Sequence, residues 1–282
     1  MQHKGQENAF SICSKPETSI AIRDRIDALI EKGSGKIAIG FGGNPKDKSA
    51  VRGGPAFELI FNIHNLLRKK KLRDNFDLTF FAPMESPGER MGPKSLQMIE
   101  SMFKKYKITK HFGKKIKSFE PSGVVFDDDS VLKSELTLFI PASAGHIVLK
   151  NSDLPLTEAG LIKIDETCLV TGTNNIYAAG DIAAIEGPKW KAKQGHIAEL
   201  MGRQAAYNII MSETGSSIRK SYKEHLNILC IMDTGNGAAF VFRNDNWAFA
   251  IPMPGLGHWL KMGWGQYAKL TKRGIIPRFP GL

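Results

Sequence analysis

Two short apolar runs joined by a helical pattern constrain the fold of this chain more than any other feature. Residues 36–43, KIAIGFGG, are typical of a buried strand that ends in a glycine turn, and residues 78–83, LTFFAP, of a second strand. Between them lies a predicted helix, residues 55–71, which begins at Pro55 and whose apolar residues recur at the helical period. Strand, crossover helix and strand form a right-handed βαβ unit. We therefore predict an α/β fold with a Rossmann-like, nucleotide-binding type of domain.

The remaining chain continues the same mixture of helices and strands. A helix is expected at about 92–106, followed by an antiparallel meander and a buried strand within residues 112–142. Residues 176–181, IYAAGD, predict a strand that ends in a glycine turn, and a helix should follow from about 191 to 211. The last section, 223–282, holds two candidate strands and a short helix rich in aromatic and basic residues.

Composition excludes several classes of protein. The 282 residues carry a formal net charge of +11, but they show no zinc-finger spacing, helix-turn-helix pattern or RNA-recognition signature, so no nucleic-acid partner is expected. Three widely spaced cysteines do not make a secreted disulfide framework or a metal site. No apolar run reaches the ~20 residues that span a bilayer.

Residues 173–181, TNNIYAAGD, resemble the second FAD motif of the pyridine-nucleotide-disulfide oxidoreductase superfamily. The resemblance implies that Gly180 lets the backbone approach FAD and that Asp181 accepts a hydrogen bond from the ribityl chain. The following helix would begin at residues 193–196 (Lys193, Gln194, Gly195 and His196) and direct its N-terminus at the pyrimidine edge of the flavin. A chance strand, turn and helix remains the alternative, and His196 could be an ordinary helix residue.

Four further stretches occur in a characteristic order: residues 10–14, FSICS; 53–58, GGPAFE; 78–83, LTFFAP; and 229–235, LCIMDTG. They resemble sulfide:quinone oxidoreductases and the flavoprotein subunit of flavocytochrome c sulfide dehydrogenase. The resemblance implies an FAD-dependent enzyme that passes electrons from sulfide through cysteines and FAD to quinone. It also implies that Gly54 and Pro55 begin a helix at the cofactor, and that the protein is peripheral to the bacterial cytoplasmic membrane.

The chain departs from that family pattern in its glycine motifs. No G-x-G-x-x-G unit for the ADP part of FAD is present, so we expect a truncated chain or one subunit of a split enzyme. Gly42 is followed by Gly43 and a long charged loop, and Pro83 stands near the usual place of the ribose-binding acid. The NAD(P)-like domain is therefore expected to be vestigial.

The resemblance to this family implies that the chain divides into four parts. Residues 1–30 would be the end of an FAD domain or its crossover, and 31–144 the vestigial nucleotide domain. Residues 145–212 would be the second FAD-binding segment, and 213–282 a region that meets quinone and membrane. A type II NADH:quinone dehydrogenase-like enzyme and a non-catalytic assembly partner are the competing functions, and a homo-oligomer stays open.

The resemblance assigns catalytic roles to three residues. Cys13 and Cys230 would flank the flavin and take up sulfide as thiolates, for which a positive or polar environment should lower the pKa. Glu58 would carry protons for quinone reduction. The alternatives are two buried apolar cysteines and a first-turn glutamate that stabilises its helix. We expect Cys168 to be incidental and His64 to be a core histidine.

The C-terminal segment has the composition of an interfacial membrane helix. Its apolar residues fall on one side: Trp259, Leu260, Trp264, Tyr267 and Leu270. Its basic residues, Lys261, Lys269, Lys272 and Arg273, lie elsewhere around the helix. Aromatic rings at headgroup depth and lysines near anionic lipid would hold such a helix on a membrane. A helix that docks on the protein core or at a dimer contact is the alternative.

Overall fold

The computed structural model describes residues 3–277, and a four-stranded parallel sheet forms its centre. The strand order is β3 (Thr109–Phe112), β2 (Phe76–Ala82), β1 (Gly35–Phe41) and β7 (Leu136–Ile140). β1 pairs with β2 on one side and with β7 on the other. The strands predicted at 36–43 and 78–83, the buried strand that ends the 112–142 region and the α/β fold class are thus confirmed.

Side chains of β1 alternate between two separate hydrophobic clusters, as the pleat of a strand requires. Ile37 and Ile39 face the helices α1 (Pro16–Lys32), α2 (Gly54–Lys69) and α3 (Pro93–Lys105). Ala38 faces the antiparallel meander of β4 (Ile116–Glu120), β5 (Gly123–Phe126) and β6 (Val131–Lys133). Both faces of the strand are therefore covered, which explains its continuous apolar sequence.

Stacked aromatic rings join α2 to the sheet. Phe57 on α2 stacks on Phe80 of β2 with 4.7 Å between ring centroids, and Phe103 of α3 lies against the same ring at 5.3 Å. The helices predicted at 55–71 and 92–106 are confirmed. α1 was not predicted, because only Ile22 and Ile26 are buried along it and so thin an apolar stripe gives little periodicity.

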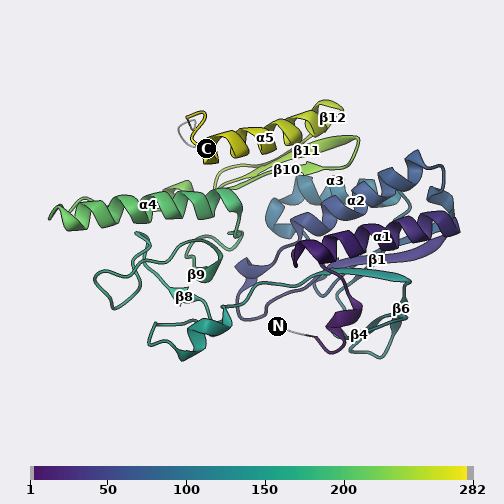
Figure 1. Cartoon of the computed structure of the whole chain (residues 1–282), viewed down its shortest axis with the longest axis horizontal. Helices are drawn as coiled ribbons and strands as arrows, with labels where there is room; N and C mark the ends of the chain where they lie inside the picture. The colour runs from purple at the N-terminus through teal and green to yellow at the C-terminus, as the bar shows by residue number, and fades with distance from the viewer. Residues whose placement is uncertain (1–2, 278–282) are drawn as a thin grey trace.

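Residues 145–213 form a second unit made mainly of loops. It contains β8 (Ile162–Lys163), β9 (Ala183–Ala184) and the long helix α4 (Gly195–Glu213), which projects to the left in Figure 1. The strand predicted at 176–181 is wrong, since only Tyr177 makes an isolated bridge and residues Gly180–Ile182 form a 3-10 turn. Gly180 has φ +75°, a left-handed conformation that cannot continue a pleated strand.

The C-terminal part adds an antiparallel sheet and one helix. The sheet comprises β10 (Ile228–Asp233), β11 (Gly237–Arg243) and β12 (Ala248–Pro254), and it lies over α2 and α3 in Figure 1. β12 was not predicted; its Pro252 and Pro254 are tolerated because it is an edge strand.

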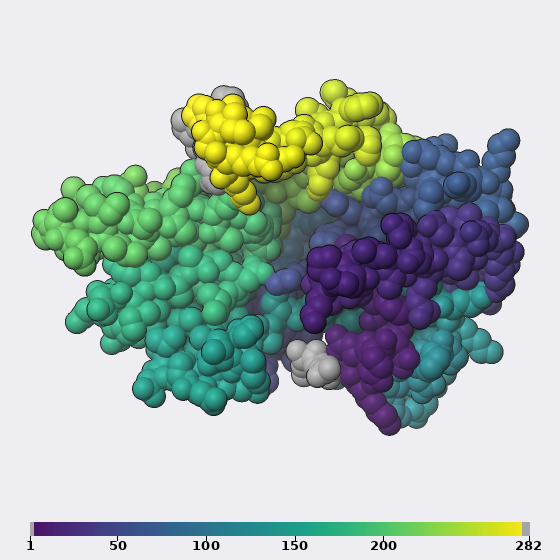
Figure 2. Space-filling model, viewed as in Figure 1, coloured from purple at the N-terminus to yellow at the C-terminus, as the bar shows by residue number. Residues whose placement is uncertain are grey.

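Helix α5 (Leu256–Lys272) covers the outer side of this sheet and forms part of the molecular surface, drawn in yellow in Figure 2. A Cβ atom at Gly257 would lie only 2.6 Å from that of Ala238, so the glycine lets the helix approach the sheet closely. None of the described helices is long and apolar enough to cross a membrane.

Candidate functional site

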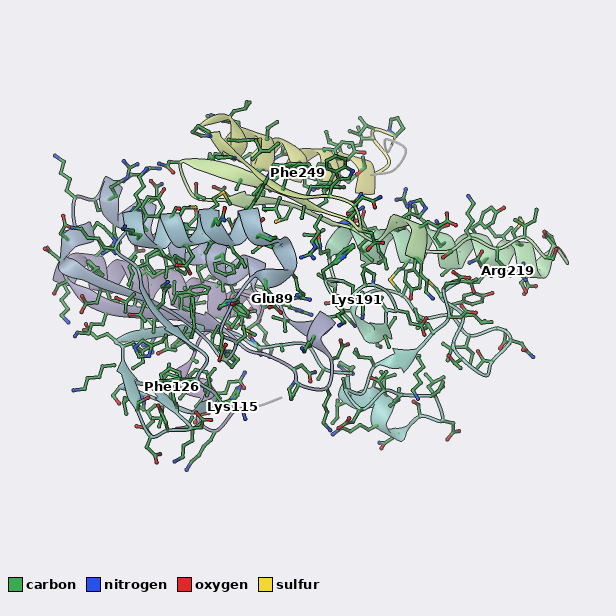
Figure 3. The ribbon with its side chains drawn as sticks, turned by 180° about the vertical axis from the view of Figure 1, so that it is seen from behind. Glu89, Lys115, Phe126, Lys191, Arg219 and Phe249 are labelled. Carbon is green, nitrogen blue, oxygen red and sulfur yellow. The ribbon has the colours of Figure 1, made fainter. Side chains whose placement is uncertain are left out.

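The start of α2 and the segment before α4 meet beside the carboxyl end of β1. Arg90 links them, because its Nη2 donates to the carbonyl oxygen of Val51 (2.9 Å) and its Nη1 to that of Lys191 (3.0 Å). Figure 3 shows Lys191 next to Glu89, the neighbour of this arginine. Burial lowers the pKa of Arg90, whose guanidinium satisfies two backbone carbonyls far apart in the sequence.

Asp181 lies between two cations at this junction. Its carboxylate accepts a 2.5 Å hydrogen bond from Arg52, while Lys193 donates to the backbone carbonyls of Asp181 and Ala183. Burial lowers the pKa of Lys193 to about 8, and the carboxylates of Asp47 and Asp181 oppose that shift. The Asp181 side chain itself is half exposed, at 50 %. The cluster therefore presents an accessible carboxylate within positively charged surroundings.

The N-terminus of α4 is open to an anionic ligand group. Its N-cap residue, Gln194, makes no side-chain capping hydrogen bond, and the first turn contains no acidic residue. Gly180 packs against this helix, since a Cβ atom there would lie 3.4 Å from that of Ala198. The partial positive charge of the helix end therefore lies near the Asp181 turn.

The same helix start is tied to β10. The side-chain oxygen of Gln194 accepts a hydrogen bond from the backbone N–H of Leu229 at 3.3 Å. His196 Nε2 lies 2.8 Å from Asn227 Oδ1, and burial is the main cause that lowers its pKa. A neutral imidazole would donate this hydrogen bond from Nε2, so His196 has a defined partner one residue before β10.

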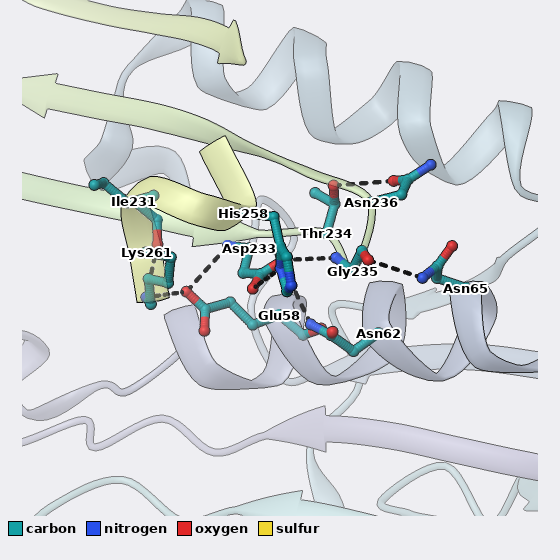
Figure 4. A network of polar contacts seen from close by, with 10 residues as sticks. All are labelled: Glu58, Asn62, Asn65, Ile231, Asp233, Thr234, Gly235, Asn236, His258 and Lys261. Carbon is teal, nitrogen blue, oxygen red and sulfur yellow. Dashed lines mark hydrogen bonds and ion pairs between the residues drawn. The ribbon is translucent and has the colours of Figure 1, made fainter. Parts of the chain in front are cut away.

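A second polar cluster connects α2, β10 and α5 (Figure 4). The carboxylate of Glu58 accepts a hydrogen bond from Lys261 Nζ at 2.8 Å, and the same amine donates to the carbonyl oxygen of Ile231 at 2.7 Å. Asp233 Oδ2 lies 2.9 Å from His258 Nδ1. The backbone N–H of Asp233 also donates to Glu58 at 3.4 Å. One network thus holds two acids, a cation and a histidine at β10.

Cys230 borders this network. Burial raises the pKa of its thiol to about 11, the negative charge of Glu58 acts in the same direction, and the positive charge of Lys261 opposes both. The expectation of a lowered pKa is therefore wrong for this cysteine, because desolvation outweighs the single nearby cation.

The other two cysteines occupy different environments. Cys13 is exposed on the turn before α1, and all three cysteines are free thiols. Cys168 is fully buried, its Sγ lies 3.7 Å from the carbonyl oxygen of Met201, and burial raises its pKa to about 12. These contacts give Cys168 a packing role.

Other predicted residues take simple structural positions. Gly54 and Pro55 form the first turn of α2, as the sequence indicates. His64 is buried, as we expected, and its Nδ1 accepts a hydrogen bond from Arg73 Nε at 3.0 Å.

Several polar residues of the two clusters were not predicted. They are Arg52, Arg90, Asp233 and His258. Arg52 directly precedes the GGPAFE stretch and Asp233 lies within LCIMDTG, so proximity to these motifs could have indicated both. Lys261 was assigned to the surface of the tail, but it contacts Glu58, which lies 203 residues away.

Comparison with known proteins agrees with this arrangement. The profile of the pyridine nucleotide-disulphide oxidoreductases matches residues 70–206, which include the Asp181 turn and the start of α4. Over these residues, just under half of the chain, the sequence is similar to this family. A curated relative, the sulfide-quinone reductase of Aquifex aeolicus (strain VF5), is 26 % identical over 94 % of the chain. The alignment covers 62 % of that relative, so the chain spans less than two thirds of its length.

Solved structures show the same fold. The sulfide:quinone oxidoreductase of Aquifex aeolicus superposes with a TM-score of 0.83 and 23 % identity, over 98 % of this chain and 68 % of that one. A NAD-dependent persulfide reductase from A. fulgidus superposes with a TM-score of 0.60 and 15 % identity, over 87 % of this chain and 42 % of that one. The Rossmann-like core and its added antiparallel sheets are therefore a known arrangement.

The environment of Cys230 gives a first prediction. Glu58→Gln removes a negative charge that raises the thiol pKa, so alkylation of Cys230 should begin at lower pH than in the parent chain. Lys261→Met removes a charge that lowers this pKa and should shift alkylation to higher pH. Both are measured as maleimide labelling rate against pH in a Cys13→Ser background. The same midpoint in both variants would contradict the geometry of this cluster.

Proposed function

We propose that this chain acts in an FAD-dependent oxidoreductase that oxidises sulfide and reduces quinone. The observation that carries the proposal is the position of Cys230, which packs against the core that includes α2 and precedes Ile231, whose carbonyl oxygen binds Lys261 of the Glu58–Lys261 ion pair. A thiol can hold sulfur, and an adjacent carboxylate and amine can exchange protons with a substrate. The 26 % identity to a sulfide-quinone reductase supports this choice of substrates.

The Asp181 junction fits part of FAD. Asp181 has an accessible carboxylate for a ribityl hydroxyl group, and the uncapped N-terminus of α4 suits the edge of the flavin on which negative charge gathers. Lys193 and Arg52 add positive charge beside it. We propose that these residues, with Gly180 and the α2 start at Gly54, hold the flavin half of the cofactor.

FAD, when bound, supplies a carrier that takes up two electrons and gives them to quinone. Oxidation of sulfide to zero-valent sulfur releases two electrons, and quinone needs two electrons and two protons to become quinol. Cys230 and Cys13 would bind the sulfur, while Glu58 would pass protons and Lys261 would hold its carboxylate in place. Burial raises the pKa of Cys230, so its resting form is the thiol. A sulfur–sulfur bond between this cysteine and sulfide requires the loss of two electrons, for which bound FAD would be the acceptor, and of the thiol proton, which Glu58 would relay.

The proposed function predicts distinct effects at the three cysteines. In excess FAD and without oxygen, sulfide should bleach the flavin absorption of the parent protein. Cys13→Ser and Cys230→Ser should each abolish this bleaching, because both thiols hold sulfur. Cys168→Ser, the control, should leave it intact, since that thiol is fully buried. Bleaching by NADH but not by sulfide, or equal tolerance at all three positions, would contradict the proposal.

Asp181 should contribute to flavin affinity. Asp181→Ala removes a charge-assisted hydrogen bond to the cofactor, worth about 1.5–3 kcal/mol, and should weaken binding of FAD by roughly ten- to a hundredfold. The measurement is quenching of flavin fluorescence on titration with protein. Asp153→Ala, at an exposed carboxylate outside the junction, serves as the control. Equal affinity of both variants and the parent would remove Asp181 from the flavin site.

Attachment to a membrane is the last part of the proposed function, because quinone is soluble in lipid. Helix α5 is docked on β11 and β12, yet several of its apolar residues are exposed, with Trp259 at 69 %, Leu256 at 64 % and Met262 at 53 %. The helix therefore docks on the protein, which was the alternative for the tail, and still exposes an apolar face. We propose that its exposed face lies at the headgroup level of a membrane.

A further inference from the structure

A pocket of about 270 Å³ lies at the end of α2 opposite to the Asp181 junction. Its lining comes from the C-terminal ends of α2 and α3 and from the turn between β10 and β11. The lining residues are His64, Arg68, Lys105, Tyr106 and Asn236. None of them is acidic, and only Asn236 also belongs to the polar network of Figure 4.

Arg73 braces the aromatic side of this pocket. Its Nε donates to His64 Nδ1 at 3.0 Å and its Nη2 donates to the carbonyl oxygen of Tyr106 at 2.7 Å. The rings of His64 and Tyr106 stack with 4.1 Å between centroids. Burial lowers the pKa of His64 to about 4, so the ring is neutral at physiological pH. Since Nδ1 accepts a hydrogen bond, Nε2 carries the proton and is a donor.

The charges of the pocket favour an anion. The C-terminal end of a helix carries about half a negative charge, so α2 and α3 together contribute roughly one. Arg68 and Lys105 line the pocket, whereas their exposed sequence neighbours Lys69 and Lys104 do not. The two positive charges of the lining exceed the roughly one negative charge of the two helix ends. Arg68 is also held in place, because its Nη2 donates to Asn65 Oδ1 at 3.1 Å.

The pocket adjoins the start of α5. The carbonyl oxygen of Asn236 accepts a hydrogen bond at 3.2 Å from the backbone N–H of Gly255, the residue before α5. Figure 4 shows Asn236 beside Thr234 on the β10–β11 turn, whose Gly235 contacts Asn65 of α2. Leu256 and Trp259, both largely exposed, follow within one turn. An anion-binding pocket and an apolar helix face thus lie side by side, as an amphiphilic ligand would require.

We propose that this pocket binds the phosphate of an anionic phospholipid headgroup while the exposed face of α5 meets the acyl chains. The proposal rests on the membrane attachment proposed above. Arg68, Lys105 and the Nε2–H of His64 would donate hydrogen bonds to the phosphate oxygens, and Asn236 would meet the glycerol part of the headgroup.

Two charge-matched pairs of substitutions test the proposal on the 282-residue chain. The pocket pair is Arg68→Gln with Lys105→Gln, and the matched pair is Lys69→Gln with Lys104→Gln. Sedimentation is measured with vesicles of phosphatidylcholine alone and with added phosphatidylglycerol. If the attraction is only diffuse, both double variants should lose vesicle binding equally, by about fivefold for each basic residue removed. A headgroup site predicts a further loss of roughly tenfold for the pocket pair, because specific charge-assisted hydrogen bonds disappear.

A second arm identifies the source of the phosphate. Glycerol phosphate should perturb the NMR signals of His64 and Asn236 in the parent chain and not in the pocket pair, and it should do so at lower concentration than inorganic phosphate. Equal loss of vesicle binding in both pairs, or no perturbation at the pocket, would overturn the proposal. Equal response to both soluble phosphates, with vesicle binding unaffected by the pocket pair, would identify a site for free phosphate and also overturn it.

The membrane attachment itself can fail separately. Trp259→Ala with Trp264→Ala should weaken binding to both kinds of vesicle, because it removes apolar burial rather than charge. If the parent chain binds no vesicles, the membrane part of the proposed function is wrong. The lipid assignment of the pocket then falls as well, whereas the flavin and sulfide tests are unaffected.

Discussion

Burial of β1 on both faces fixes the direction of α2, and both candidate sites depend on that helix. Ile37 and Ile39 pack toward the helices, Ala38 toward the meander, and the stack of Phe57 on Phe80 holds α2 against the sheet. Aromatic pairs of this kind contribute about 0.5–1.5 kcal/mol beyond the area that they bury. The helix therefore begins at the carboxyl end of β1, where parallel α/β sheets bind their ligands.

The two ends of α2 serve different chemistry. Arg52 precedes its first turn and binds Asp181, and Glu58 follows one turn later and binds Lys261. The opposite end carries Arg68 beside the pocket near α5. The same helix thus connects the proposed flavin site with the proposed membrane surface. Helix α5 supplies Lys261 to Glu58 and exposes Trp259, so it contributes both to the polar cluster and to the proposed membrane surface.

The sequence predicted the elements whose apolar pattern is strong, and it missed those whose stability comes from tertiary contacts. The apolar run of β1 and the periodic helix α2 were clear, whereas α1 buries only two isoleucines and β12 contains two prolines. The Asp181 turn was identified from its motif although its strand does not form. Lys261 and Glu58 could not be paired, because no local pattern links residues so far apart, and the pKa of Cys230 depends on burial that only the fold reveals.

The central claim is that one surface, at the N-terminal ends of α2 and α4 and along β10, receives the flavin. Hydrogen–deuterium exchange of the chain with and without FAD tests it most directly, because the measurement reports position without requiring turnover. If the flavin binds at this surface, the segments 51–58, 180–198 and 228–233 will exchange more slowly in the presence of FAD. Protection centred on other segments, or unchanged exchange at FAD concentrations that quench flavin fluorescence, would contradict it.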